Sequence, residues 1–202
     1  MATRIRRNPD DAKRMILEAA SRLLASGGPA AVQVRAVATE IGVTDAAINH
    51  HFGTRDQLLE ALLRFGGATL RAELHAVLET WNEGPVDPAG LVQALHRLYA
   101  GGYAELALAL NRSGWRDSRS GMLNEVVDRL YARARQECAA AGRKSPSRKD
   151  IQLTVAALHQ AMVMEPLFGD EFRRSAGLEA TASDPMIDWW IRTLRATVAG
   201  SR

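Results

Sequence analysis

Apolar residues recur along this chain every three to four positions, which is the spacing of amphipathic helices. No stretch shows the apolar–polar alternation of a half-buried strand. In the first periodic segment the apolar residues share one helical face: Ile16, Ala19, Ala20, Leu23 and Leu24. The pattern therefore predicts an all-α protein.

Residues with capping preferences mark where helices begin and end. Residues 8–10 (Asn-Pro-Asp) open the first helix, because proline is accommodated in a first helical turn. Residues 27–29 (Gly-Gly-Pro) end it. Thr54 and Gln57 have the spacing of a capping box and predict another helix start.

The same signals place the remaining helices. We expect them over residues 34–40, 44–50, 68–82, 88–100, 102–115, 120–141, 147–168 and from 184 onward. Gly66-Gly67 predicts a break or kink after the helix that begins at Thr54. Pro166 should kink its helix or end it early, and residues 170–183 are expected to be irregular.

One segment carries a helix-turn-helix pattern. Counting from Val34, the small residue Ala38 stands fifth, where two helices touch, and Gly42 stands ninth, where the turn needs a positive φ. Val43 and Ile48 are expected to supply the buried anchors that fix the angle between the helices. Thr44 caps the second helix, whose N-terminal face is left free to point outward.

Composition excludes several classes of protein. The net charge of +3, from 26 basic and 23 acidic residues, does not by itself indicate nucleic-acid binding. No run approaches the roughly 18 apolar residues of a membrane span, and Glu18 and Arg22 interrupt what would be the apolar part of a signal peptide. The single cysteine, Cys138, excludes an internal disulfide and fits a reducing compartment. We therefore expect a cytoplasmic protein with no membrane partner.

Catalytic and metal-binding signatures are missing from the sequence. It has no phosphate loop, His-Glu-x-x-His, Cys-x-x-Cys or Gly-x-Ser-x-Gly motif. The histidines show no metal-ligand spacing beyond one adjacent pair: His50, His51, His75, His96 and His159. We expect neither an enzyme nor a bound cofactor or metal.

Two stretches together resemble a known family. "ILEAASRLLASGG" and "VQVRAVATEIGVTDAAINHHFGTRDQLLEALL" resemble the N-terminal domain of TetR/AcrR-type transcriptional regulators over about residues 12–63. His51-Phe52 and Thr54-Arg55-Asp56 match the family's signature between the recognition helix and the next one. Two positions depart from the pattern, because Asn49 replaces a phosphate-contacting tyrosine and Gln33 replaces a Ser/Thr cap.

The resemblance implies that residues 44–50 enter the major groove of double-stranded DNA. Asp45, Ala46, Ala47 and Asn49 are then placed to face bases, since asparagine pairs with adenine and alanine contacts a thymine methyl group. Asp45 either accepts from cytosine or repels other bases, or it only favours the helix dipole.

Other residues are assigned to the phosphates, which fix register rather than sequence. Thr44, His50 and Arg55 are the candidates, and Gln33 completes the predicted contact set. Arg35 either contacts phosphate as well or forms a surface salt bridge. Ile48 and Phe52 are assigned to the apolar core. His51 is interpreted as a structural histidine beside Phe52 rather than a ligand.

The expected domain organisation has three parts. Residues 1–8, with three arginines in the first seven, form either a solvated terminus or a flexible arm that touches phosphates. Residues 9–66 form the DNA-binding domain, and residues 67–202 form a helical effector-binding and dimerisation domain.

A homodimer is expected, because one helix-turn-helix reads few base pairs whereas two related by a two-fold axis read a palindrome. The interface candidates are the helices over residues 120–141 and 147–168. Their apolar residues either form the interface or fill the core within one chain: Leu123, Val126, Val127, Leu130, Tyr131, Val155, Leu158 and Met162.

The resemblance also implies a pocket for a small-molecule effector. Aromatic, methionine and histidine side chains that either line it or only pack the core are Trp81, His96, Tyr99, Tyr103, Trp115, Met122, His159, Met162 and Phe168. The expected function is a repressor released from a palindromic operator by a small, largely apolar effector. The alternative is a DNA-binding regulator or architectural protein that needs no ligand.

Overall fold

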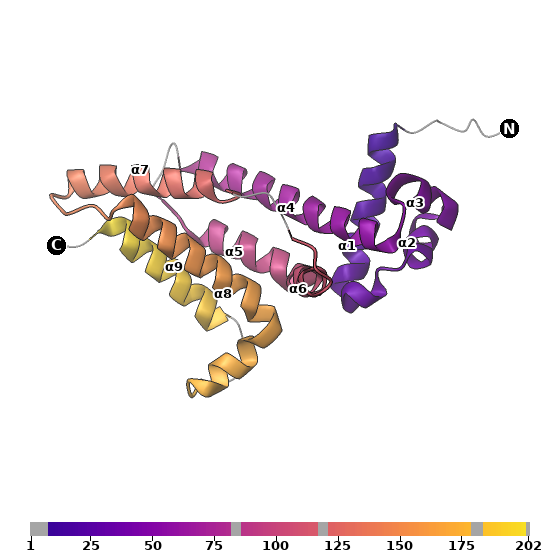
Figure 1. The fold of residues 1–202 in the computed structure, drawn as a ribbon. Coiled ribbons are helices and arrows are strands. Elements are labelled where there is room, and N and C mark those ends of the chain that lie inside the picture. Colours follow the sequence, from indigo (N-terminus) through magenta and orange to yellow (C-terminus); the bar gives the residue numbers. More distant parts are fainter. Residues whose placement is uncertain (1–7, 82–85, 117–120, 179–183, 201–202) are drawn as a thin grey trace. The chain divides into compact units, whose positions relative to one another are not determined.

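The computed structural model describes residues 8–81, 86–116, 121–178 and 184–200 (Figure 1). These residues form helices joined by turns and loops, so the predicted all-α class is confirmed. The elements are α1 (Pro9–Ala31), α2 (Val34–Ile41), α3 (Asp45–Phe52), α4 (Arg55–Thr80), α5 (Ala89–Leu98), the π-helical turn η1 (Tyr99–Tyr103), α6 (Ala104–Arg112), α7 (Asn124–Ala140), α8 (Arg148–Ser175) and α9 (Asp184–Ala199).

The chain divides into two compact units. The first combines the residues up to Gly67 with Gly101–Arg116, and the second combines Ala68–Ala100 with the residues from 117 onward. The division at Gly67 lies next to the expected domain boundary, but α6 groups with the N-terminal helices rather than with the larger unit. The roles expected of the two domains remain predictions, and the arm over residues 1–8 lies almost wholly outside the described residues.

Local capping signals set the helix starts as expected. The Asn8 side chain accepts from the Asp10 amide. Thr54 and Gln57 exchange hydrogen bonds, at 2.9 Å from the Thr54 amide to Gln57 Oε1 and 3.2 Å from the Gln57 amide to Thr54 Oγ1. A second capping box opens α8, between Ser147 and Asp150.

The first unit packs the inner faces of its helices around one apolar core. Fully buried side chains come from α1, α2, α3 and α4: Ile16, Leu24, Val37, Ile48, Leu58 and Leu62. Regular helix in α1 ends where expected, at Gly27 and Gly28, whose backbone angles leave the helical region. Phe52, expected in this core, is only half-buried.

The expected break at Gly66-Gly67 is wrong, because α4 runs through both glycines. Gly66 is buried, and a Cβ built on it would overlap the ring of Tyr103. Tyr103 also donates from its hydroxyl to Ser21 Oγ at 3.1 Å. Gly66 is therefore explained by the close approach of an aromatic ring, and not by a change in the course of the helix.

The expected irregular segment after residue 170 is also wrong in part, because α8 continues through Pro166 to Ser175. Proline removes one hydrogen bond to the carbonyl four residues earlier and bends a helix at that point. Figure 1 shows α8 changing direction in its last third. Glu165 and Asp170 both bind the Arg173 guanidinium, and the Glu165–Arg173 pair joins the turns on the two sides of the proline.

The second unit has its own core, built from α5, α7, α8 and α9 with the end of α4. Six of the residues predicted for the dimer interface are buried inside this core: Val126, Val127, Leu130, Val155, Leu158 and Met162. They cannot meet a second chain without unfolding this unit, so the alternative of intrachain packing is correct for them.

The contact between Gly66 and Tyr103 can be tested by adding one methyl group. Gly66→Ala should lower the free energy of unfolding by about 1–3 kcal/mol, because the new Cβ forces the Tyr103 ring out of its position. In most helix interiors the same change is stabilising. Urea denaturation would measure the difference.

Gly101→Ala is the matched control, because Gly101 has φ −74° and a Cβ there meets no atom within 4 Å. It should leave stability within about 0.5 kcal/mol. A Gly66→Ala protein as stable as the wild type would show that the ring does not occupy this space.

Candidate nucleic-acid interface and effector cavity

The turn between α2 and α3 is set by Gly42. Its φ of 69° and ψ of 37° are left-handed, a conformation that costs glycine little. The Val43 amide donates to the Ala38 carbonyl at 2.9 Å, and the Gly42 amide donates to Thr39 at 3.3 Å. These two bonds form a Schellman motif, which ends α2 and sends the chain directly into α3.

Helix α3 has one buried side and one exposed side. Ile48 is buried, while Asp45, Ala46, Asn49 and His50 are exposed and Ala47 is half-buried. Residues spaced by one, three and four positions lie on adjoining parts of a helical surface. The structure therefore brings most of the predicted base-facing residues together on the solvent side of α3. Thr44 Oγ1 caps the helix by accepting from the Ala47 amide at 3.2 Å.

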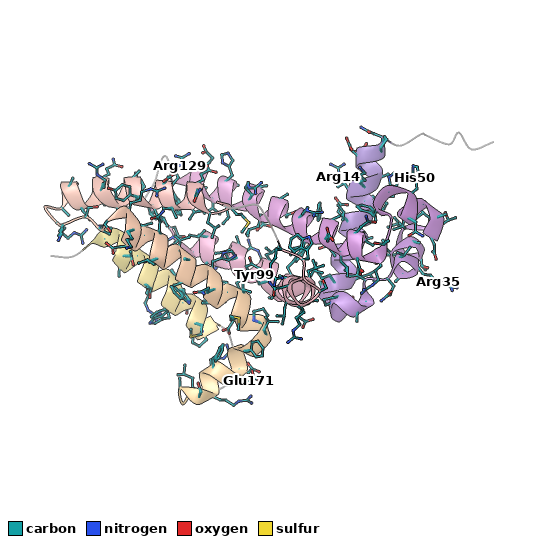
Figure 2. The ribbon with its side chains drawn as sticks, viewed as in Figure 1. Arg14, Arg35, His50, Tyr99, Arg129 and Glu171 are labelled. Carbon is teal, nitrogen blue, oxygen red and sulfur yellow. The ribbon has the colours of Figure 1, made fainter. Side chains whose placement is uncertain are left out.

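Three more predicted contact residues surround this helix. Arg35 on α2 and His50 at the end of α3 are exposed and project from the unit (Figure 2). Gln33 precedes α2 as its N-cap residue, but its side chain donates to the Ala30 carbonyl at 2.9 Å and does not cap the helix. His51 is half-buried, and its ring meets that of His50 at a centroid distance of 5.4 Å.

Arg55 has an internal role that its sequence position did not reveal. Its Nε donates to the Val32 carbonyl at 2.8 Å, and its Nη2 donates to the Pro29 carbonyl at 2.6 Å. Pro29 lies in the last turn of α1, after the break at Gly27 and Gly28, and Val32 is the C-cap residue of α1. Arg55 thus attaches the first turn of α4 to the C-terminal end of α1.

The second unit contains a cavity of about 1060 Å³ along α8. Its walls come from α8, from Leu178 beyond it and from the start of α9: Ala156, His159, Gln160, Ala161, Val163, Met164, Glu165, Gly169, Phe172, Arg173, Ala176, Leu178 and Met186. Of the nine residues predicted to bind an effector, only His159 is in this lining.

His159 forms a polar pair with Tyr99, another predicted residue. The Tyr99 hydroxyl and His159 Nε2 lie 2.5 Å apart, and the ring centroids are separated by 5.6 Å. Burial raises the pKa of Tyr99 to about 12 and lowers the pKa of His159 below its usual value. Both groups are therefore uncharged near neutral pH.

The other predicted effector residues are dispersed. Tyr103 and Trp115 belong to the first unit, where the Trp115 ring lies 5.7 Å from the Arg64 guanidinium carbon. Trp81 and Met162 are buried in the core of the second unit. Phe168 is 42% exposed, His96 lines a smaller hollow of about 460 Å³, and Met122 is half-buried ahead of α7.

Sequence reasoning missed much of the cavity, because part of its lining is alanine and part falls in residues that were expected to be irregular. Pro166 was the one usable signal, since a kinked helix often leaves space beside it. Within the described ranges, no helix is both long and apolar enough to cross a membrane. The same residues contain no group of three or more His, Cys, Asp or Glu side chains able to hold a metal ion.

Comparison with known proteins finds similarity in the N-terminal helices. Residues 16–62 match the model of the family described as bacterial regulatory proteins, tetR family. A stretch of 61 residues is 43% identical to the HTH-type transcriptional repressor Rv3405c of Mycobacterium tuberculosis and to the HTH-type transcriptional regulator Mb3439c of Mycobacterium bovis. The match covers 30% of this chain and 32% of each relative, so the chain matches these relatives over about a third of their length.

Similar solved structures extend over more of the chain at lower identity. A putative tetR family transcription regulator from Shewanella sp. PV-4 is 21% identical and covers 87% of this chain and 95% of its own, with a TM-score of 0.42. The fatty acid degradation regulator FadR from Bacillus halodurans is 16% identical and covers 94% and 99%, with a TM-score of 0.46.

The family match covers the helix-turn-helix that the sequence predicted, including the turn at Gly42 and the exposed helix α3. Over these helices the chain is similar to the tetR family of bacterial regulatory proteins.

Proposed function

We propose that this chain is a homodimeric transcription repressor that binds a palindromic operator in the cytoplasm and leaves it when a small, mainly apolar effector binds. The observation that carries the DNA-binding part is the exposed side of α3, presented by the Gly42 turn and the Thr44 cap. The residues that face the bases are Asp45, Ala46, Ala47 and Asn49. The residues that contact the phosphate backbone of the DNA are Gln33, Arg35, Thr44 and His50.

The cavity along α8 supports an effector-responsive regulator over one that needs no ligand. Helix α4 supports coupling, because it is one uninterrupted helix that begins in the first unit and ends in the second. An effector that binds one arrangement of the second unit more tightly than another raises the population of that arrangement. Helix α4 then transmits the change to the helix-turn-helix. Typical coupling free energies of this kind are about 1–3 kcal/mol.

The dimer is proposed to form through α8 and α9. Large apolar side chains are exposed on these two helices, with Leu153 60% and Trp189 48% accessible. In a dimer with a two-fold axis, α8 and α9 of one copy pack against α8 and α9 of the other. The helix-turn-helix of each copy then contacts one half of a palindrome.

Selection of bound sequences from random double-stranded DNA tests the proposed function directly. A dyad-symmetric consensus is expected, and binding to it should be competed poorly by scrambled DNA of the same length. Enrichment of no sequence, with or without a mixture of small metabolites, would contradict the proposal.

Asn49→Ala should weaken binding to the selected operator by about 1–3 kcal/mol and relax the base preference at one position of each half-site. The reason is the loss of a side chain that pairs with two atoms of one base. Fluorescence anisotropy against a panel of single-base operator variants measures both effects. Gln93→Ala, an exposed change on α5, is the control and should leave both unchanged.

Arg55 and Arg35 are expected to differ in a way that separates positioning from phosphate binding. Arg55→Gln should lower the free energy of unfolding by about 1–3 kcal/mol, because two carbonyls lose a charged donor. It should also weaken operator binding without changing how that binding depends on salt. Arg35→Gln should leave stability within about 0.5 kcal/mol and reduce the slope of log affinity against log salt by about 0.9.

Anisotropy titrations over a range of potassium chloride concentrations, with urea denaturation of the same samples, make this comparison. A reduced salt slope for Arg55→Gln at unchanged stability would assign Arg55 to the phosphates instead.

Leu153→Asp should convert the dimer to a monomer, since a carboxylate would have to be buried between two copies without a partner. Sedimentation equilibrium measures the dissociation constant, and operator affinity should fall with it. Ala132→Asp, on an exposed position of α7, is the control and should remain dimeric. A dimeric Leu153→Asp protein would place the interface elsewhere.

A further inference from the structure

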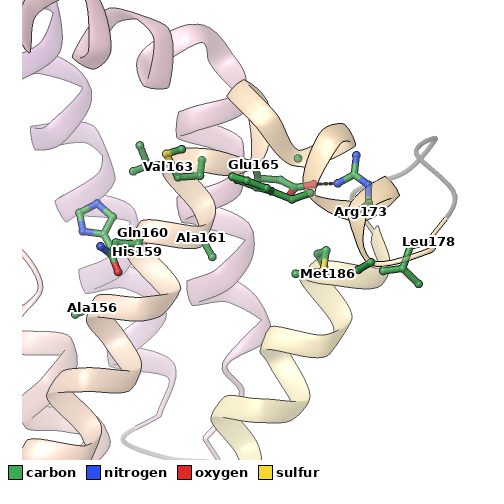
Figure 3. A pocket seen from close by; sticks show the side chains of 13 residues that line it. Ala156, His159, Gln160, Ala161, Val163, Glu165, Arg173, Leu178 and Met186 are labelled. Carbon is green, nitrogen blue, oxygen red and sulfur yellow. Dashed lines mark hydrogen bonds and ion pairs between the residues drawn. The ribbon is translucent and has the colours of Figure 1, made fainter. Parts of the chain in front are cut away.

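The cavity along α8 is bounded by residues on both sides of the Pro166 bend. Ala156 to Glu165 precede the proline, and Gly169 to Ala176 follow it (Figure 3). The bend gives this surface its concave shape, because a straight helix would present one convex face. A volume of about 1060 Å³ is at the upper end of what small-molecule sites occupy.

The charged residues of the lining, Glu165 and Arg173, are already engaged, and Asp170 from outside the lining also binds Arg173. Glu165 and Arg173 form an ion pair, and their side chains are only 10% and 7% exposed (Figure 3). Gly169 makes this pair possible, since a Cβ there would lie 2.7 Å from the Glu165 carboxylate. An ionic ligand would have to compete with a partner that is already in place, and breaking a buried ion pair is strongly unfavourable.

The remaining lining offers apolar contact and a few neutral polar groups. Alanine, valine, methionine, phenylalanine and leucine side chains dominate it. His159 lines the cavity with Nε2 engaged by the Tyr99 hydroxyl, and burial holds the pKa of this histidine below its usual value. A neutral imidazole whose second nitrogen is not engaged by Tyr99 can form one hydrogen bond with a ligand.

We infer that the effector site is this α8 cavity, and that it takes an uncharged, mainly apolar molecule with a single hydrogen-bonding group, such as an alcohol, a phenol or an ester. This inference rests on the proposed function for its biological meaning, but binding itself does not require DNA. It moves the site away from Trp81, Tyr103, Trp115 and Phe168, which do not line the cavity.

A second copy of the chain is the competing occupant, because the cavity lies on α8 and α9. The side chains proposed for the dimer interface, Leu153 and Trp189, are absent from the lining.

The test uses the full-length protein and the neutral fluorescent probe N-phenyl-1-naphthylamine. Wild-type protein should enhance its fluorescence saturably. Three compounds with the same ten-carbon chain then displace it: decanol, decanoate and decyltrimethylammonium. Decanol should act at about tenfold lower concentration than either ion, because the ions must bury a charge without a free partner.

Ala161→Trp places an indole in the cavity and should abolish probe binding. Ala132→Trp, the same change on an exposed position of α7, should bind the probe as the wild type does. Circular dichroism and thermal melting check that both proteins fold. If Ala161→Trp does not fold, Ala156→Trp at the rim of the same cavity replaces it and should reduce affinity for the probe.

Three results would overturn the inference. They are absence of probe binding to the wild type, displacement by decanoate or decyltrimethylammonium as effective as that by decanol, and unchanged binding in both tryptophan variants that line the cavity. Operator binding by the same samples, measured without any added compound, keeps this outcome separate from the proposed function. A protein that selects a palindrome but ignores the probe retains its DNA-binding role and loses only this site.

Discussion

The helix-turn-helix of this protein depends on one backbone turn. Gly42 adopts a left-handed conformation, and the two amide–carbonyl bonds around it end α2 and begin α3 within three residues. Ala38 and Ile48 are both almost completely buried, so the two helices meet with little space between them. The exposed side of α3 follows from this geometry, because whatever is not packed against α2 is left facing solvent.

What the sequence predicted well was local. Helix caps at Asn8, Thr54 and Ser147 act over three residues or fewer, and they appear in the structure as expected. The helix-turn-helix belongs to the same category, since its constraints lie within a short stretch of chain. Such features are determined by backbone conformation and nearby hydrogen bonds, which residue type reports directly.

What the sequence predicted poorly depends on partners far along the chain. Gly66 was interpreted as a helix breaker, whereas its reason is the ring of Tyr103. The helix that contains Pro166 was expected to reach only about residue 168, whereas it continues to Ser175 and Glu165 pairs with Arg173 across the proline. Arg55 was assigned to phosphate, which stays a prediction, but its Nε and Nη2 also donate to two carbonyls more than twenty residues earlier. In each case the deciding contact has no signature in the local pattern.

The grouping of α6 with the N-terminal helices makes the first unit discontinuous in sequence. The peptide chain passes between the two units at three places, after residues 67, 100 and 116. A fragment cut after residue 67 would lack the Tyr103 ring above Gly66 and the buried Leu106 and Leu110 of α6. The helix-turn-helix unit is therefore not a detachable module, and grafting it onto another protein would require a redesigned connection that carries α6 along.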